Sequence, residues 1–245
     1  MSAEAALVVA AVLVASTVQS AVGFGFAIVA APVLAATAGP QTAAPTLALV
    51  GTLVNVLTLA AERRRLDVLM PTAATLVAWS LPGMAGGAAI LAYATPDALR
   101  ALVAVAVLGA VAAYARRGRG THRGAPRAAD SAAVGTLSGF LATSTGLNGP
   151  PLVLHLLGRA SAGQMRDTLA AVFLVTGVLT VGVLSLDGVL DPAPNLAALT
   201  AASFAGWALG RLGFASLGHR HEAASLGVLA LGAALALVVV AQTVV

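Results

Sequence analysis

Long apolar stretches make up most of this chain, and short segments rich in glycine, proline or charge separate them. The stretches cover residues 5–37, 42–61, 68–93, 97–115, 131–158, 164–186, 195–215 and 222–244. About 20 apolar residues are enough for one helix to cross a bilayer. The short alternating segments of an outer-membrane barrel are absent from the sequence. The pattern therefore predicts an all-α polytopic membrane protein.

Composition strengthens this prediction and narrows the chemistry. The 245 residues are 59% hydrophobic and 9% charged, against roughly 25% charged residues in soluble proteins. There is no cysteine, which excludes disulfides and thiolate metal sites. No His-Glu-x-x-His pattern, paired intramembrane carboxylates or nucleophile elbow is present, so we expect neither an enzyme nor a bound cofactor or metal. All 13 basic residues are Arg; in a membrane protein they report orientation, and we expect no nucleic-acid partner.

The chain reads as one apolar unit written twice, 123 positions apart without a gap. Glycines and serines carry this repeat best, because they mark backbone constraints. Five glycine or serine pairs and one leucine pair coincide: Gly23/Gly146, Leu34/Leu157, Ser80/Ser203, Gly83/Gly206, Gly87/Gly210 and Gly109/Gly232. We predict a first transmembrane repeat at 1–115, a basic linker at 116–130 and a second repeat at 131–245. Duplicated halves in a membrane protein favour a transport site between them.

The first stretch of each half is interrupted. Residues 5–37 are too long for one span and too short for two, with glycines breaking the run at 22–26. The second half breaks at 145–151, where Pro150 and Pro151 exclude a straight helix. If both stretches are re-entrant hairpins, the halves are inverted and 12 of the 13 Arg share one face, with Arg100 opposite; straight crossings divide them eight to five. The positive-inside rule favours the inverted arrangement, with the linker cytoplasmic and both termini outside.

Two hairpin tips of this kind predict an anion site. Each hairpin would end one half-helix and start another near the membrane centre, where the second half-helix presents N–H groups and its positive dipole end. Neutral donors also cluster there, among them Gln19, although each hydroxyl alone is better explained by a bond to a helix carbonyl. Phe24 and Phe26 are expected to gate the site or shield it from lipid. The candidate substrate-binding residues are Ser20, Gly23, Phe24, Gly25, Phe26, Thr143, Ser144, Thr145, Gly146, Asn148 and Gly149.

A second group of residues is suited to a path or to ion coupling. Asn55 has Thr52 and Thr58 one turn to either side, a stripe that lines a path or holds helices together. His155 follows the second break and is either a proton relay or an interfacial side chain. Asp167 is a proton acceptor, or it forms an interfacial ion pair, in which it and Arg166 pair with each other or with the linker. Arg211 complements a helix C-terminus or guides anions inward.

The two break motifs also carry a family resemblance. The segment Gly23-Phe24-Gly25-Phe26-Ala27-Ile28-Val29-Ala30-Ala31-Pro32-Val33-Leu34 resembles the first signature of the sulfite exporter TauE/SafE family, and residues 139–153 look like its second. The resemblance covers nearly the whole chain. It implies a permease for small anions, often sulfite or organosulfonates, in the bacterial inner membrane. That family usually has glycine where Asn148 stands, so Asn148 adds a side-chain amide at the expected site.

Together these features predict a secondary transporter that binds a small oxyanion between two inverted repeats. An anion channel, a carrier of a small carboxylate and a membrane-embedded accessory subunit are the alternatives. The expected partners are the anion and the lipid bilayer, and a homodimer is left open as the assembly.

Overall fold

The computed structural model describes residues 3–62, 65–116 and 127–217, and this part of the chain is helical without strands. The predicted final stretch 222–244 and most of the linker lie outside the described residues. The helices are α1 (Ala3–Val22), α2 (Phe26–Thr37), α3 (Pro40–Ala60), α4 (Met70–Tyr93), α5 (Pro96–Arg116), α6 (Ala128–Thr145), α7 (Gly149–Leu156), α8 (Ala162–Leu186) and α9 (Leu196–Leu217).

Four of these helices are long and apolar enough to cross a membrane: α1, α3, α4 and the part of α8 from Gly163 to Leu186. Large apolar side chains on their outer faces, such as Trp79 on α4 and Val178 on α8, are about half exposed. Such faces suit lipid rather than water. The prediction of an all-helical membrane protein is confirmed.

Both predicted breaks are present. Gly23 and Gly25 have φ angles of 93° and 111° between α1 and α2, and Gly146 has a φ of 77° after α6. Only glycine adopts these angles without strain, so the backbone can turn at these positions. At the second break, Gly146 also caps α6 by donating its N–H to the carbonyl of Ala142 at 3.2 Å.

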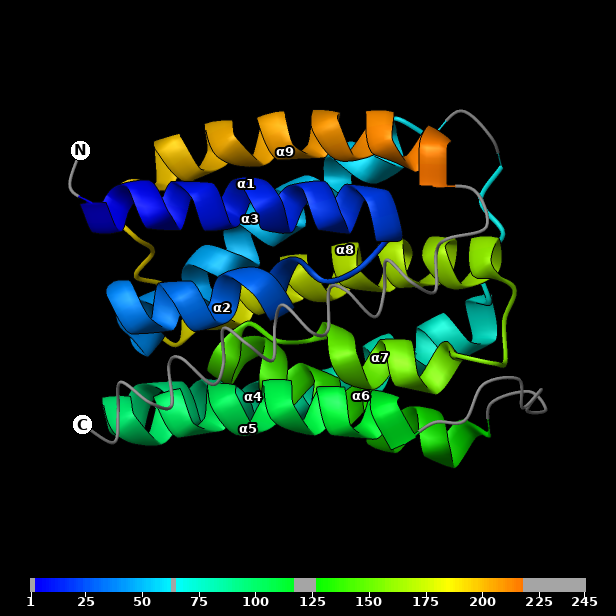
Figure 1. Ribbon diagram of the computed structural model, residues 1–245. Helices are drawn as coiled ribbons and strands as arrows, with labels where there is room; N and C mark the ends of the chain where they lie inside the picture. Colours follow the sequence, from blue (N-terminus) through cyan, green and yellow to red (C-terminus); the bar gives the residue numbers. More distant parts are fainter. Residues whose placement is uncertain (1–2, 63–64, 117–126, 218–245) are drawn as a thin grey trace.

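We expected each hairpin to consist of two half-helices, but α1, the first helix of the first hairpin, is longer than a half-helix. Helix α1 has 20 residues and α6 has 18, whereas α2 has 12 and α7 has 8. At 1.5 Å per residue, α1 is about 30 Å long, enough for a full crossing. Gly23 and Gly25 come directly after α1, so the first break follows a helix of spanning length and precedes a short one. Figure 1 shows the chain turning back from the end of α1 before α2 begins.

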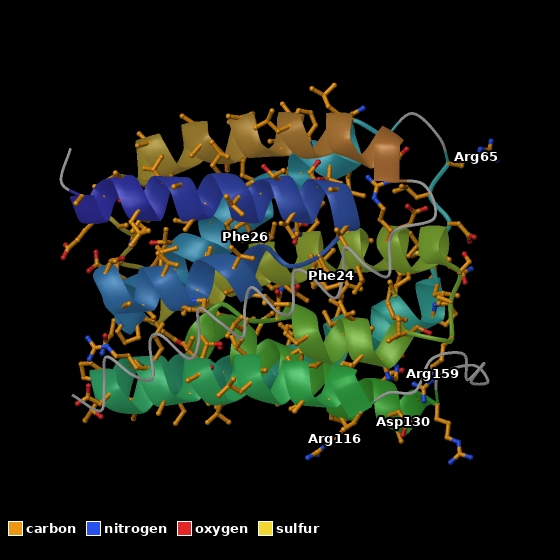
Figure 2. All side chains as sticks on the ribbon, in the orientation of Figure 1. Phe24, Phe26, Arg65, Arg116, Asp130 and Arg159 are labelled. Atoms are coloured by element: carbon orange, nitrogen blue, oxygen red, sulfur yellow. The ribbon has the colours of Figure 1, made fainter. Side chains whose placement is uncertain are left out.

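The two hairpins start from opposite ends of the bundle. Helix α1 begins at the left end in Figure 1, and α2 returns to that end. Helix α6 begins at the right end, and α7 returns there: Asp130 in the first turn of α6 and Arg159 after α7 approach to 3.8 Å (Figure 2). Each hairpin therefore leaves the bundle on the side from which it came.

Repeat-related helices pair crosswise. Helix α4 packs against α6, and α9, its counterpart in the second half, packs against α1. A Cβ on Gly83 or Gly87 would collide with the carbonyls of Thr136 and Phe140 in α6. A Cβ on Gly206 or Gly210 would collide with those of Leu13 and Thr17 in α1. These contacts correspond under the 123-residue shift, so the same glycines allow the same close helix approach in both pairs.

Candidate functional site

A cavity of about 50 Å³ lies where the two breaks meet. One water needs about 10–15 Å³ on this measure, so the cavity has room for a few waters or an ion of a few heavy atoms. Residues of both hairpins and of the two helices between them, α3 and α8, form its walls. They are Gln19, Gly25, Phe26, Ala27, Ile28, Leu47, Ala48, Gly51, Thr52, Asn55, Ala142, Gly146, Asn148, Gly149, Pro150, Phe173, Gly177 and Thr180.

The lining follows the sequence repeat. Four pairs of lining residues are related by the 123-residue shift: Gln19/Ala142, Gly25/Asn148, Phe26/Gly149 and Ala27/Pro150. The first half supplies the side-chain amide in the pair Gln19/Ala142, and the second half supplies it in the pair Gly25/Asn148. The cavity is therefore built from equivalent backbone positions with different side chains, which gives an asymmetric polar surface on a repeated frame.

Gln19 organises the first tip through two hydrogen bonds. Its Oε1 accepts the N–H of Phe26 at 3.1 Å, and its Nε2 donates to Oδ1 of Asn55 at 2.9 Å. Because a backbone N–H can only donate, the first bond fixes which end of the Gln19 amide faces α2. The second bond then fixes Asn55, whose remaining Nδ2 group is a donor. The first amide of α2 is thus already bonded to a side chain, so it is not among the N–H groups that the tip offers to a ligand.

Other donors at the site have no acceptor within the described residues. The first bond of α2 runs from Val29 N–H to the carbonyl of Gly25, which leaves the N–H groups of Ala27 and Ile28 without a partner. The Oγ1 of Thr180 is buried and also without a partner in that part of the chain. Asn148 Nδ2 makes one long bond of 3.4 Å to Thr176 Oγ1. On the α7 side, Pro150 and Pro151 have no N–H, so backbone donors are fewer there.

No Arg, His, Asp or Glu is among the described residues that line the cavity. The polar groups at the wall are neutral amides, hydroxyls and the N-terminal ends of α2 and α7. Helix N-termini carry partial positive charge. An anion is therefore the ligand that this surface suits best.

The predicted substrate-binding residues divide into two groups. Gly25, Phe26, Gly146, Asn148 and Gly149 line the cavity together with Asn55 of the predicted path. The six remaining residues do not line it and have other contacts. The hydroxyls of Thr143, Ser144 and Thr145 donate to carbonyls, mostly within α6. Gly23 faces the side chain of Arg166, and Phe24 is buried in the apolar core. Ser20 lines a different cavity.

His155 is held away from the cavity. Its Nδ1 lies 3.0 Å from Nη1 of Arg159, and its Nε2 lies 2.9 Å from Oγ of Ser131. A guanidinium can only donate, so Nδ1 is the acceptor and Nε2 carries the proton that Ser131 accepts. The cluster holds a neutral imidazole beside a cation and does not bring it to the anion site.

Asp167 and Arg166 each contact a residue of the connection between α3 and α4. The carboxylate of Asp167 accepts the N–H of Asp67 at 2.8 Å, and Thr168 accepts that of Leu69 at 3.0 Å. Arg166 pairs with Glu62 at 3.4 Å. The start of α8 thereby fixes the connection between α3 and α4. Partners about 100 residues apart give no local signal in the sequence.

Arg211 lines a second cavity with Arg166 and Glu62. Its guanidinium stacks 5.2 Å from the ring centroid of Trp207. Its Nη1 donates to the carbonyl of Ala61 at the end of α3, so it complements the C-terminus of α3 rather than that of its own helix.

Sequence reasoning grouped Gln19 with the neutral donors near the first break, but it placed neither Gln19 nor the small residues Gly51 and Gly177 among the candidate substrate-binding residues. A Cβ on Gly51 would lie 3.3 Å from the Phe26 ring, and one on Gly177 would meet Thr52. These glycines let α3 and α8 approach the tips. Their signal in the sequence is weak, because small residues are common throughout this chain.

Comparison with known proteins gives one clear result. Residues 8–239 match the family model described as sulfite exporter TauE/SafE. No curated protein and no solved structure matches the chain. The match covers nearly the whole sequence, and the family is one of membrane transport proteins for sulfite-type anions rather than of enzymes. With its apolar helices and its paired glycine breaks, the chain belongs to the TauE/SafE sulfite exporter family.

Proposed function

We propose that this protein is a secondary carrier that binds a small oxyanion, such as sulfite or an organosulfonate, in the central cavity. The observation that carries the proposal is a small cavity between two helix N-termini whose polar wall consists of neutral donors. A cavity of about 50 Å³ suits an ion with few heavy atoms.

Neutral donors are suited to a transported ion. A desolvated anion needs hydrogen bonds in place of its lost hydration. The N–H groups of Ala27 and Ile28, the amides of Asn55 and Asn148 and the hydroxyl of Thr180 supply them. A buried guanidinium would hold an oxyanion far more firmly. Transport requires binding strong enough for loading and weak enough for release.

The proposal includes an inverted repeat in the inner membrane of a bacterium. The opposite directions of α1 and α6 in Figure 1 support the inversion. Arg65 and Arg159 lie at the same end of the bundle (Figure 2), which supports a cytoplasmic position for that end and for the linker. The cavity would then lie near the middle of the bilayer, between the two halves.

Uptake by purified protein in liposomes tests the function. We expect saturable uptake of radiolabelled sulfite or taurine that a counter-ion gradient drives. Fast ohmic current would instead identify the anion channel alternative. Preferential uptake of small carboxylates would identify the other carrier alternative.

The substitution Asn148→Leu tests the site. It removes one of the few donors of the second tip, and we expect it to abolish sulfite binding while the protein still folds. Ser144→Ala is a matched control, because the Ser144 hydroxyl donates to the Phe140 carbonyl at 2.7 Å and does not line the cavity. Unchanged affinity in Asn148→Leu would refute binding at the hairpin tips.

A further inference from the structure

A second cavity, of about 130 Å³, lies beside the end of α3 where the connection to α4 begins. Its lining is Ser20, Thr58, Glu62, Arg166, Trp207 and Arg211. We propose that this cavity is a second binding site for the transported oxyanion, which the ion occupies between the central cavity and this end of the bundle. The inference rests on the proposed function, because it gives the same anion a second station.

The charges of this cavity suit an anion. Arg166 pairs with Glu62 at 3.4 Å, with side chains only 16% and 22% exposed. Arg211 stacks on the Trp207 ring and is exposed to solvent. Two guanidinium groups and one carboxylate give the lining a net positive charge. Guanidinium groups present paired donors that match the oxygens of an oxyanion.

Trp207 supplies a second, independent observation. Its Nε1 is buried and has no hydrogen-bond acceptor within the described residues. A buried indole N–H normally has a partner. Ser20, which also lines the cavity, donates to the backbone carbonyl of Trp207 at 2.9 Å, which ties α9 to α1 at this point. An oxyanion in the cavity would provide the acceptor that Nε1 lacks.

A polar stripe connects the two cavities. Thr52 and Asn55 line the central cavity, whereas Thr58 and Glu62 line the second one. Thr52, Asn55 and Thr58 follow the spacing of one helix face, Thr58 lies about 4.5 Å further along α3 than Asn55, and Glu62 follows directly after the end of α3. On α1 the neighbouring residues Gln19 and Ser20 divide between the two cavities in the same way.

The stripe on α3 therefore functions as a path rather than only as a contact between helices. The two proposed binding sites differ in chemistry: arginine side chains and an indole line the second cavity, whereas neutral donors line the central cavity. An ion that moves from the second cavity to the central cavity would exchange its hydration first for charged partners and then for amides and hydroxyls. Two sites of moderate strength allow an ion both to enter and to leave.

Tryptophan fluorescence tests this site directly, because the chain contains only two tryptophans. Trp79 is 51% exposed on α4, so Trp79→Phe leaves Trp207 as the reporter. In nanodiscs of zwitterionic lipid at low ionic strength, we expect sulfite to change the Trp207 emission saturably. Adding Arg211→Gln should raise the half-saturating concentration about tenfold, because a charge-assisted hydrogen bond is lost. Arg100→Gln, which removes an arginine at the start of α5, should leave it unchanged.

The complementary variant Trp207→Phe reports only Trp79 and should show non-saturating collisional quenching. A non-saturating response of Trp207, or an unchanged half-saturation in Arg211→Gln, would overturn the second site. So would a saturable response to anionic lipid but not to sulfite, which would identify a lipid phosphate as the ligand. If Asn148→Leu still impairs liposome uptake in those cases, the central site stands by itself. Absence of oxyanion uptake by the wild-type protein would overturn both.

Discussion

The substitution Gln19→Glu should remove anion binding by charge alone. Glutamate has nearly the same shape as glutamine, and a carboxylate oxygen can still accept the Phe26 N–H that Gln19 now accepts at 3.1 Å. The Asn55 amide, which faces Gln19 at 2.9 Å, can rotate and donate its Nδ2 to the carboxylate. The N-terminus of α2 also favours a negative charge beside it. The local hydrogen bonds therefore survive, while the cavity wall becomes anionic.

The size of the effect follows from Coulomb's law. Two unit charges about 5 Å apart repel by about 3 kcal/mol at an effective dielectric constant of about 20. A loss of 3 kcal/mol weakens binding more than about a hundredfold. The half-saturating sulfite concentration for uptake, or the ligand-dependent increase in thermal stability of the purified protein, measures this loss.

Two further variants separate charge from structure. Gln19→Met removes both hydrogen bonds without adding charge, and we expect its affinity to stay within about tenfold of wild type. Gln41→Glu makes the same chemical change in the first turn of α3, away from the cavity, and should bind as the wild type does. Wild-type affinity in Gln19→Glu, or equal losses in the Glu and Met variants, would refute an anion beside Gln19.

Three other predictions concern packing, the connection after α3 and proton coupling. Gly139→Ala places a methyl group against the backbone of Ser80 and should destabilise the protein by about 1–3 kcal/mol. Gly182→Ala, with no neighbour within 4 Å, should be neutral or stabilising by up to about 1 kcal/mol. Thermal unfolding compares the two variants, and equal effects would contradict the close approach of α4 and α6. Asp167→Ala removes the acceptor of the Asp67 N–H. It should speed tryptic cleavage at Arg65 about tenfold, because about 1.4 kcal/mol of local stability is lost. An unchanged cleavage rate would show that Asp167 does not fix the connection between α3 and α4. His155→Gln should leave the pH profile of sulfite uptake unchanged, because His155 bonds to Ser131 and Arg159 outside the cavity; a shifted profile would make His155 a proton relay.

Much of the helical frame could be predicted from the sequence, because its signals are strong and local. Glycine and proline clusters marked both breaks, and long apolar runs marked the spanning helices. The repeat glycines Gly83 and Gly206 lie where an added Cβ would collide with a backbone carbonyl of the neighbouring helix. Such positions tolerate no side chain, so glycine there carries information that alanine and leucine in this chain do not.

The details of the site depended on facts that the sequence does not display. Successive helix residues point about 100° apart, so Thr143, Ser144 and Thr145 could not all face one cavity, and their hydroxyls bond to carbonyls instead. The role of Gln19 appears only once α1 is known to continue to Val22 and α2 to begin at Phe26. Only then does the Gln19 side chain lie against the first amide of the short helix.

The crosswise pairing of helices has a consequence for biogenesis. Since α1 rests on α9 and α4 rests on α6, the first half of the chain leaves the ribosome with its main partners still unmade. Stable tertiary structure must await synthesis of nearly the entire polypeptide, and each half serves as the template on which the other is completed. Two separately expressed fragments, cut within residues 117–126, should accordingly assemble when made in the same cell, while either fragment alone should be degraded.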